Sequence, residues 1–295
     1  MPPRGAALFP ALFVLLWSTG FIAAKLGLPD APPFSFLFVR FVCVAALMAA
    51  VAIATGARWP TKREEIVDAS IAAWLVHGGY LGGVFVAISR GMPAGTAAML
   101  VGMQPIVTVF LARAWLGERV LPRQWVGLAL GIVGVWLVVR EKVSFDADPG
   151  ALVAIVIALF SISVGTIWQK RHASHVDLRT GAVIQFTACA IAYLPLALLF
   201  ESDRAIHWTP AFAFAIGWSV LVLSVGAISL LYWLLRHGAA SGVASLFYLV
   251  PPVTALMAWA LFGERLGAAA FAGLAVIVVA VALARPPAVP GRGGT

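Results

Sequence analysis

One arginine stands out in this sequence because it lies inside a long apolar stretch. Arg40 falls in the run PFSFLFVRFVCVAALM, about seven residues after the run begins. At 1.5 Å per helical residue, that position lies roughly 10 Å from the nearer helix end. A charge at such depth predicts a contact with a substrate, or else a structural hydrogen bond or a side chain that snorkels to the surface. The sequence leaves these interpretations open.

A second polar group occupies a later apolar run. Ser70, Trp74, His77 and Tyr80 follow one another at steps of four, three and three residues. This spacing predicts one helical face, which either lines a cavity or holds a histidine whose hydrogen bonds are satisfied in the core. No Cys, His, Asp or Glu shares that face, so no metal ion is expected there.

Prolines interrupt two further apolar runs. Pro105 and the pair Pro251-Pro252 each remove the hydrogen bond to a carbonyl four residues earlier. The carbonyls that we expect to be freed are those of Val101, Phe247 and Tyr248. Such carbonyls are tolerated inside a membrane only within protein or beside a water-filled cavity, where they can accept a substrate ammonium group. The kinks serve either this purpose or packing.

Further candidates for a binding cavity surround these breaks and the first apolar run. Gln104 and Tyr248 adjoin the prolines, and Met99 and Met103 are one helical turn apart and would form an adaptable apolar wall. Trp17 lies in the middle of its run beside Ser18, Thr19 and Gly20, whereas tryptophans of the membrane interface lie at helix ends. It therefore lines the cavity or packs in the core.

The elements that position these residues follow from composition. The chain has 295 residues, of which 62% are hydrophobic and 11% charged, against roughly 25% charged in soluble domains. Its mean hydropathy is +0.99. These values exclude a soluble enzyme, a disordered chain and a disulfide scaffold, and the two cysteines, Cys43 and Cys189, lie in apolar runs. The net charge of +8 forms no basic patch for a nucleic acid.

Ten apolar segments are long enough to cross a bilayer, so membrane lipid is an expected partner. They are residues 8–28, 33–55, 66–89, 93–116, 121–140, 150–169, 178–200, 210–234, 239–262 and 266–284. With the N-terminus in the cytoplasm, 13 Lys and Arg residues fall in inside segments and 6 in outside segments. This bias predicts a multi-pass inner (plasma) membrane protein with both termini cytoplasmic.

The two halves of the chain repeat each other. A shift of 146 residues aligns Arg90–Arg119 with Arg236–Arg265, and twelve of the thirty positions are identical. Both stretches end in Gly-Glu-Arg, which predicts a helix end capped by glycine. Each half holds five segments, and because five is odd the second half is inverted. The prediction is an all-α membrane protein of ten transmembrane helices in two inverted five-helix repeats, residues 1–144 and 145–285, with a disordered tail at 286–295.

The motifs also resemble a known family. LWSTGFIAAKLGL and APPFSFLFVRF in the first two segments, ISRGMPAGTAAML before the fourth, and the paired LGER and FGER turns resemble the EamA-type transporters of the drug/metabolite transporter superfamily. The resemblance covers residues 8–284. It implies a ten-helix transporter, often an exporter of amino acids or related metabolites, and a cavity lined by the first, third and fourth segments of each half.

Missing motifs narrow the function further. The sequence has no phosphate-binding loop, no zinc-protease HExxH motif and no recognisable Ser/His/Asp arrangement, so no cofactor is expected. We expect a secondary transporter that exports small molecules by alternating access; the alternative is an intramembrane enzyme acting on lipid. His77 is the one side chain in the middle of a segment that ordinarily titrates near neutral pH. Either the protein is a facilitator, or His77 couples transport to protons. The sequence leaves the oligomeric state open.

Overall fold

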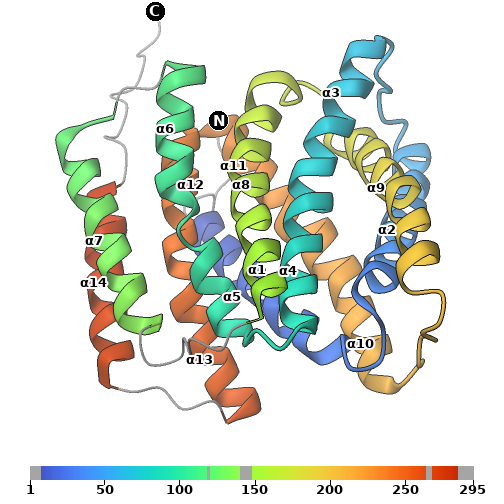
Figure 1. The fold of residues 1–295 in the computed structure, drawn as a ribbon. Coiled ribbons are helices and arrows are strands. Elements are labelled where there is room, and N and C mark those ends of the chain that lie inside the picture. Colours follow the sequence, from blue (N-terminus) through green and yellow to red (C-terminus); the bar gives the residue numbers. More distant parts are fainter. Residues whose placement is uncertain (1–7, 118–119, 140–147, 264–267, 285–295) are drawn as a thin grey trace, which may run out of the picture.

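The protein is a bundle of helices, and the described residues contain no strand (Figure 1). The computed structural model describes residues 8–117, 120–139, 148–263 and 268–284. The predicted boundary between residues 144 and 145 and the predicted disordered tail at 286–295 lie outside this part of the chain.

The first half folds into five rods, two of which are made of more than one helical piece. Its elements are α1 (Phe9–Gly27), α2 (Pro33–Ala54), α3 (Arg63–Ala73), η2 (Trp74–Gly79), α4 (Tyr80–Ser89), α5 (Ala94–Val101), α6 (Gln104–Leu116) and α7 (Pro122–Val139). The pieces α3, η2 and α4 follow one another without a gap, and α5 and α6 are separated only by Gly102 and Met103.

The second half repeats this order. Its elements are α8 (Pro149–His172), α9 (Leu178–Phe200), α10 (Pro210–Trp218), η3 (Ser219–Ala227), α11 (Ile228–His237), α12 (Ala240–Ser245), η4 (Leu246–Leu249), α13 (Val250–Phe262) and α14 (Ala268–Ala284). In Figure 1, α1 runs downwards through the bundle whereas α8 runs upwards, as an inverted repeat requires.

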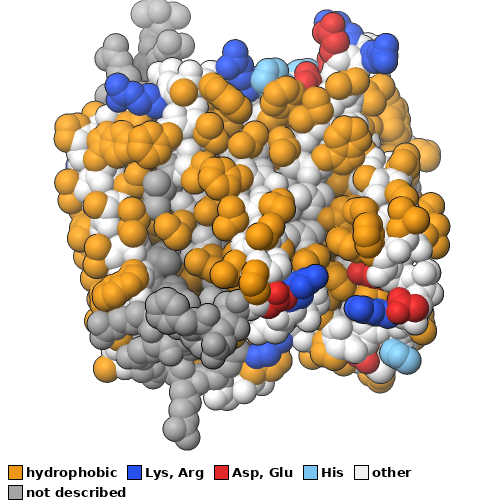
Figure 2. Space-filling model, viewed as in Figure 1, with side chains coloured by type: hydrophobic (Ala, Val, Ile, Leu, Met, Phe, Trp, Pro, Cys, Tyr) orange, Lys and Arg blue, Asp and Glu red, His pale blue; other side chains and the backbone are white. Residues whose placement is uncertain are grey.

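The surface of the bundle is suited to a membrane. Seven helical stretches of the described chain are long and apolar enough to cross a bilayer. Figure 2 shows hydrophobic side chains along the flanks of the helices, with most charged side chains towards the two ends. The all-α membrane fold in two repeats is therefore confirmed, while the count of ten crossings stays a prediction.

Corresponding helices of the two halves begin and end at equivalent residues. Ala94, where α5 begins, and Gln104, where α6 begins, lie 146 residues before Ala240 and Val250, where α12 and α13 begin. The glycines that follow α6 and α13, Gly117 and Gly263, have φ of 66° and 67°. This left-handed conformation ends a helix and is available to glycine without strain, so the predicted glycine caps are confirmed.

The prolines do not act as the sequence suggested. Pro105 is the second residue of α6, and Pro251 and Pro252 are the second and third residues of α13. The backbone N–H groups of a first helical turn have no partner within the helix. A proline, which lacks an N–H, therefore removes no hydrogen bond at these positions. The expectation that these prolines free carbonyls within a continuous helix is therefore wrong. The α-helix already gives way before each proline, to Gly102 and Met103 in the first half and to the 3-10 helical piece η4 in the second, and the prolines lie in the first turn of the piece that follows.

The expectation of one polar face along the third rod is also wrong. His77 is fully buried and Tyr80 is 3% exposed, whereas Trp74 is 51% exposed. The cause is the π-helical piece η2, in which the N–H of Tyr80 donates to the carbonyl of Leu75, five residues earlier. The extra residue in this turn rotates all later side chains by about 100° relative to those before it. Trp74 and His77 therefore point in different directions.

The two halves are tied together at the lower end of Figure 1. Glu201, which follows α9, is 5% exposed. Its carboxylate accepts hydrogen bonds from the backbone N–H groups of Phe34 and Ser35 at 2.9 and 2.7 Å, and from the Ser35 hydroxyl at 2.8 Å. The carboxylate thus caps the N-terminus of α2, where a negative charge is favourable. Nearby, the Thr209 hydroxyl donates to Asp30 at 2.6 Å.

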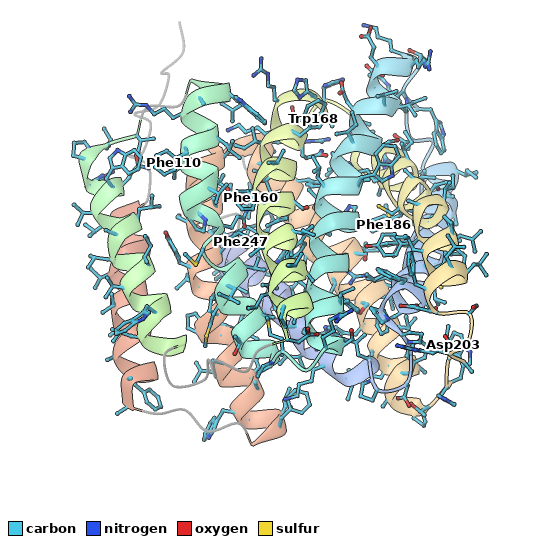
Figure 3. The ribbon with its side chains drawn as sticks, viewed as in Figure 1. Phe110, Phe160, Trp168, Phe186, Asp203 and Phe247 are labelled. Carbon is cyan, nitrogen blue, oxygen red and sulfur yellow. The ribbon has the colours of Figure 1, made fainter. Side chains whose placement is uncertain are left out.

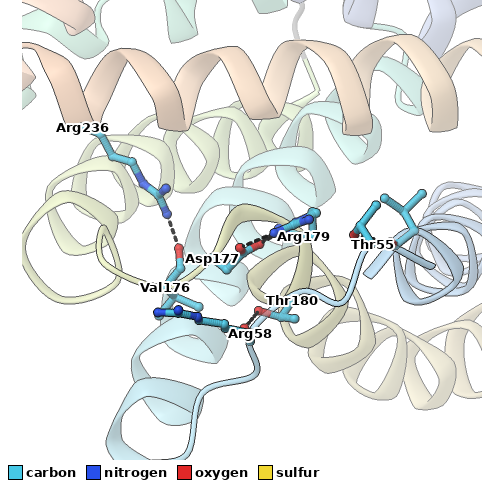
Figure 4. A network of polar contacts seen from close by, with 8 residues as sticks. Thr55, Arg58, Val176, Asp177, Arg179, Thr180 and Arg236 are labelled. Carbon is cyan, nitrogen blue, oxygen red and sulfur yellow. Dashed lines mark hydrogen bonds and ion pairs between the residues drawn. The ribbon is translucent and has the colours of Figure 1, made fainter. Parts of the chain in front are cut away.

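A second set of contacts holds the upper end (Figure 4). Asp177 caps α9 by accepting from the N–H of Arg179 at 2.8 Å, and the Arg179 guanidinium also donates to this carboxylate. These bonds lower the pKa of Asp177 to about 2. The Thr180 hydroxyl donates to the carbonyl of Arg58 in the first half at 2.9 Å, and Arg236 donates to the carbonyl of Val176.

Candidate functional site

A small cavity lies inside the bundle and is lined by both halves. Its walls come from α1, α2 and α4 of the first half and from η3 and α11 of the second. The space that a water molecule can reach is about 30 Å³, enough for roughly two waters. The lining residues are Trp17, Gly20, Phe21, Arg40, Tyr80, Leu81, Val84, Phe85, Leu223, Ala227 and Ile228.

Two aromatic residues form one wall of the cavity. The indole Nε1 of Trp17 donates a hydrogen bond to the Tyr80 hydroxyl at 3.0 Å, and the two rings stack with centroids 5.8 Å apart. The edge of Phe247, labelled in Figure 3, packs against Trp17 at 5.2 Å between centroids. Buried aromatic groups with satisfied polar ends make a rigid apolar surface. Trp17 and Tyr80 therefore lie together, as the sequence predicted.

Arg40 is the charged group of the cavity. Its side chain is 3% exposed, and its Nε donates to the hydroxyl of Ser224 on η3 at 3.0 Å. Ser224 belongs to the second half, so this bond joins the two halves. Arg40 does not snorkel to a surface, and no acidic side chain of the described chain pairs with it.

His77 lies one turn from Tyr80 but belongs to a separate polar cluster. Its Nε2 is 3.2 Å from Oε1 of Gln185, which also accepts a hydrogen bond from the Tyr232 hydroxyl at 2.8 Å. The Gln185 amide in turn donates to Gln169 at 3.0 Å. The imidazole stacks on Phe186, labelled in Figure 3, with centroids 4.4 Å apart. His77 does not line the cavity with Trp17 and Tyr80.

Three of the other candidates pack in a different place. Met99 and Tyr248 are fully buried and share an apolar cluster with Leu128 of α7, against which Met103 also packs. The hydroxyl-bearing end of the Tyr248 ring lies against Gly131, where an added Cβ would come 2.5 Å from Cζ of the ring. The expected common cavity therefore does not include these three residues in this conformation.

Gln104 is buried apart from both groups. It is the first residue of α6 and is fully buried, and neither its amide oxygen nor its amide nitrogen has a hydrogen-bond partner in the described part of the chain. A buried amide without partners is unfavourable unless water or a ligand reaches it. Gln104 does not line the cavity described above.

A larger groove, of about 670 Å³, lies between the third rod, α8 and α9. Its lining includes Gly78, Gly79, Gly82 and Gly83 and is mainly apolar. Its one charged side chain, Arg90, is paired with Asp148 at 2.9 Å. Both halves line this groove too, but it is shallow and its charged side chain is already paired. The central cavity holds Arg40, with which no acidic side chain of the described chain pairs, so the cavity is the better candidate for a binding site.

The second-half residues of the cavity carry little signal in the sequence. Leu223, Ala227 and Ile228 lie in a mainly apolar run without a charged or aromatic residue beside them, and only the small hydroxyls of Ser224 and Ser229 adjoin them. The repeat carries a signal, because Leu223 lies 146 residues after His77, and the π-helical piece η3 matches η2. Applying the repeat shift to the third rod would have pointed to this wall.

The side chains that line the cavity are suited to binding a small molecule. Its lining has one guanidinium, one phenol and one indole, and otherwise hydrocarbon. In the described chain, no group of three His, Cys, Asp or Glu is placed to hold a metal ion. The arrangement suits a small amphipathic molecule, with polar contacts at Arg40 and apolar contacts elsewhere.

Known proteins resemble this chain along nearly its whole length. The "Uncharacterized inner membrane transporter YedA" of Escherichia coli strain K12 is 28% identical over 278 residues, which cover 94% of this chain and 90% of YedA. A "Probable amino-acid metabolite efflux pump" of the same strain is 28% identical over 278 residues, 90% of each chain. A solved crystal structure, 21% identical, has the same fold, with a TM-score of 0.76 over 95% of this chain and 96% of that chain.

The family model of the EamA-like transporters matches the chain twice, at residues 4–140 and 149–285. The two matches fall on the two structural halves and together span most of the sequence. The protein is therefore a membrane transporter that belongs to the EamA-like transporter family.

Proposed function

We propose that the protein exports amino acids or related small metabolites across the inner membrane, and that the central cavity is its substrate site. The observation that carries the proposal is that both halves line one buried cavity and that the Arg40–Ser224 hydrogen bond crosses between them. A site at the interface of two inverted repeats is exposed to either side of the membrane when the repeats tilt against each other. The names of the relatives, inner membrane transporter and amino-acid metabolite efflux pump, support the membrane and the class of substrate.

Alternating access would act on the contacts that join the halves at the two ends. At the lower end these are the bonds of Glu201 to the start of α2, and at the upper end the bond from Thr180 to Arg58. One set would have to separate while the other holds. The cavity of about 30 Å³ is smaller than an amino acid, so its walls would also have to move apart to admit substrate.

The test is efflux from proteoliposomes that contain the purified protein and are preloaded with single radiolabelled amino acids. We expect downhill flux of at least one amino acid with an apolar side chain, above that of empty liposomes. Leu223→Ala should raise the rate for bulkier substrates relative to smaller ones, because Leu223 forms part of the cavity wall.

The matched control is Leu198→Ala, which removes the same atoms from a side chain that is 61% exposed on the flank of α9. It should leave the order of substrates unchanged. Equal effects of the two substitutions would contradict the assignment of the cavity. Turnover of radiolabelled lipid, with no flux of any amino acid or related metabolite, would favour an intramembrane enzyme instead.

A further inference from the structure

Arg40 leaves most of its hydrogen-bonding capacity unused. A guanidinium carries five N–H donors, and the structure gives Arg40 a single hydrogen bond, from Nε to the Ser224 hydroxyl. The side chain is 3% exposed and lines the cavity. Among the described residues, its charge has no acidic partner and is held by one neutral hydroxyl.

A neutral hydroxyl does not balance this charge. Buried charges in proteins are paired with an opposite charge, because removing one ion from water is costly unless a counter-ion lies close by. Eight of the twelve acidic residues lie in the described part of the chain, and all eight are at or near helix ends: Asp30, Glu64, Glu65, Asp68, Asp148, Asp177, Glu201 and Asp203. None of them forms an ion pair or hydrogen bond with Arg40.

The position of the acidic residues at helix ends also makes the cavity unfavourable for a positively charged substrate group. Among the described residues that line the cavity, none carries a carboxylate that could receive an ammonium group. Trp17 and Tyr80 offer ring faces, but each already packs against the other, and the Arg40 guanidinium shares their cavity and repels a second cation. The electrostatic character of the cavity therefore favours anions.

We propose that the transporter recognises its substrate through a carboxylate that pairs with Arg40, with an apolar tail against Trp17, Tyr80 and Leu223, and without a requirement for an amino group. This rests on the proposed function, since it assigns a substrate class to the same cavity. A guanidinium binds a carboxylate through two parallel hydrogen bonds, which fixes its orientation as well as its position. The substrate class is that of small molecules with a carboxylate and an apolar tail, which includes both simple carboxylic acid anions and apolar amino acids.

The test compares three ligands that share a phenyl ring but differ in charge. These are 3-phenylpropanoate, an anion; L-phenylalanine, a zwitterion; and phenethylamine, a cation. Binding to the full-length protein in detergent is measured by isothermal titration calorimetry. We expect 3-phenylpropanoate to bind at least as tightly as phenylalanine, and phenethylamine to bind at least tenfold more weakly than either. Binding of phenethylamine as tight as that of the anion would overturn the proposal, and this comparison needs no variant.

Substitutions then assign the effect to Arg40. Arg40→Gln should weaken binding of both carboxylates at least tenfold, and Arg40→Lys, which keeps the charge but loses the paired geometry, should have an intermediate effect. The control is Arg204→Gln, at an exposed position beyond α9. Folding of each variant is checked by gel filtration and thermal unfolding. A folded Arg40→Gln protein that binds 3-phenylpropanoate with native affinity would contradict the proposal.

The outcome separates this inference from the proposed function. Flux of phenylalanine in proteoliposomes that is unchanged in Arg40→Gln would leave the exporter intact and remove the role of Arg40. Binding of carboxylates that depends on Arg40, without flux of any of them, would support the site and contradict export.

Discussion

The indole of Trp17 and the phenol of Tyr80 form a stacked, hydrogen-bonded pair, with 3.0 Å between Nε1 and the hydroxyl oxygen. The two residues lie on α1 and at the start of α4, 63 positions apart in the sequence, and both are nearly buried. The pair therefore fixes the position of the third rod against the first at the cavity wall.

Breaking this pair should destabilise the protein. Tyr80→Phe leaves the indole N–H without its partner, which costs about 1–3 kcal/mol at a buried site. We expect a lower thermal unfolding temperature in detergent, by about 2–4 °C for each kcal/mol. Trp17→Phe should behave similarly, and the double variant should lose about 1 kcal/mol less than the sum of the two.

The control for this pair is Trp208→Phe, at a tryptophan that is 65% exposed before α10. It should shift the unfolding temperature by less than 1 °C, since surface substitutions change stability by about 0.5 kcal/mol or less. Strict additivity of Trp17→Phe and Tyr80→Phe would show that the hydrogen bond contributes nothing.

The sequence predicted the helices and their duplication well because both leave a direct record in residue types. Long apolar runs set the spans, and the shift of 146 residues places helix breaks and glycine caps in register, as at Gly117 and Gly263. Trp17 and Tyr80 could also be placed together, since the polar tips of both fall in the middle of apolar runs.

The incorrect predictions, of one polar face along the third rod and of a cavity that includes Tyr248, have physical causes that residue types do not reveal. The π-turn at η2 depends on a backbone hydrogen bond from Tyr80 to Leu75, which rotates Trp74 away from His77. Periodicity predicts a face of a helix but not the neighbour of that face, so nothing in the sequence indicated that Tyr248 packs on Gly131.

Glu201 provides a second test of stability, at the lower end of the bundle. Its carboxylate receives three hydrogen bonds from the start of α2, at 2.7–2.9 Å. Glu201→Gln keeps one acceptor oxygen but loses the negative charge that the helix N-terminus favours. We expect a loss of about 1–2 kcal/mol, seen as a lower unfolding temperature and faster amide exchange at Phe34 and Ser35. Asp203→Asn, at an exposed neighbour, should change neither.

The orientation in the membrane is tested by labelling single cysteines. The background replaces the native Cys43 and Cys189 by alanine, and the probes are Asp203→Cys at the lower end and Lys62→Cys before α3 (Asp203 is labelled in Figure 3). The Lys and Arg bias predicts that a membrane-impermeant maleimide added to whole cells labels Asp203→Cys and spares Lys62→Cys. The reverse pattern would place both termini outside.

His77 is the residue on which a test of proton-coupled transport depends. The imidazole is fully buried, and its partners among the described residues are Gln185 and Tyr232, neither of which is acidic. Proton-coupled carriers place ionisable groups in the membrane as a relay, and a histidine without an acidic partner is poorly suited to pass a proton on. We therefore expect a facilitator, whose flux in proteoliposomes follows the substrate gradient and is the same with and without an imposed pH gradient.

The substitution His77→Gln completes the measurement. Glutamine retains hydrogen bonding to Gln185 and Tyr232 but cannot take up a proton, so a facilitator should keep its downhill flux within about threefold and stay insensitive to pH. The matched control, His237→Gln, changes an exposed histidine at the end of α11. Concentrative uptake that is driven by the pH gradient in the native protein and in His237→Gln, and lost in His77→Gln, would overturn the facilitator and assign proton coupling to His77 alone.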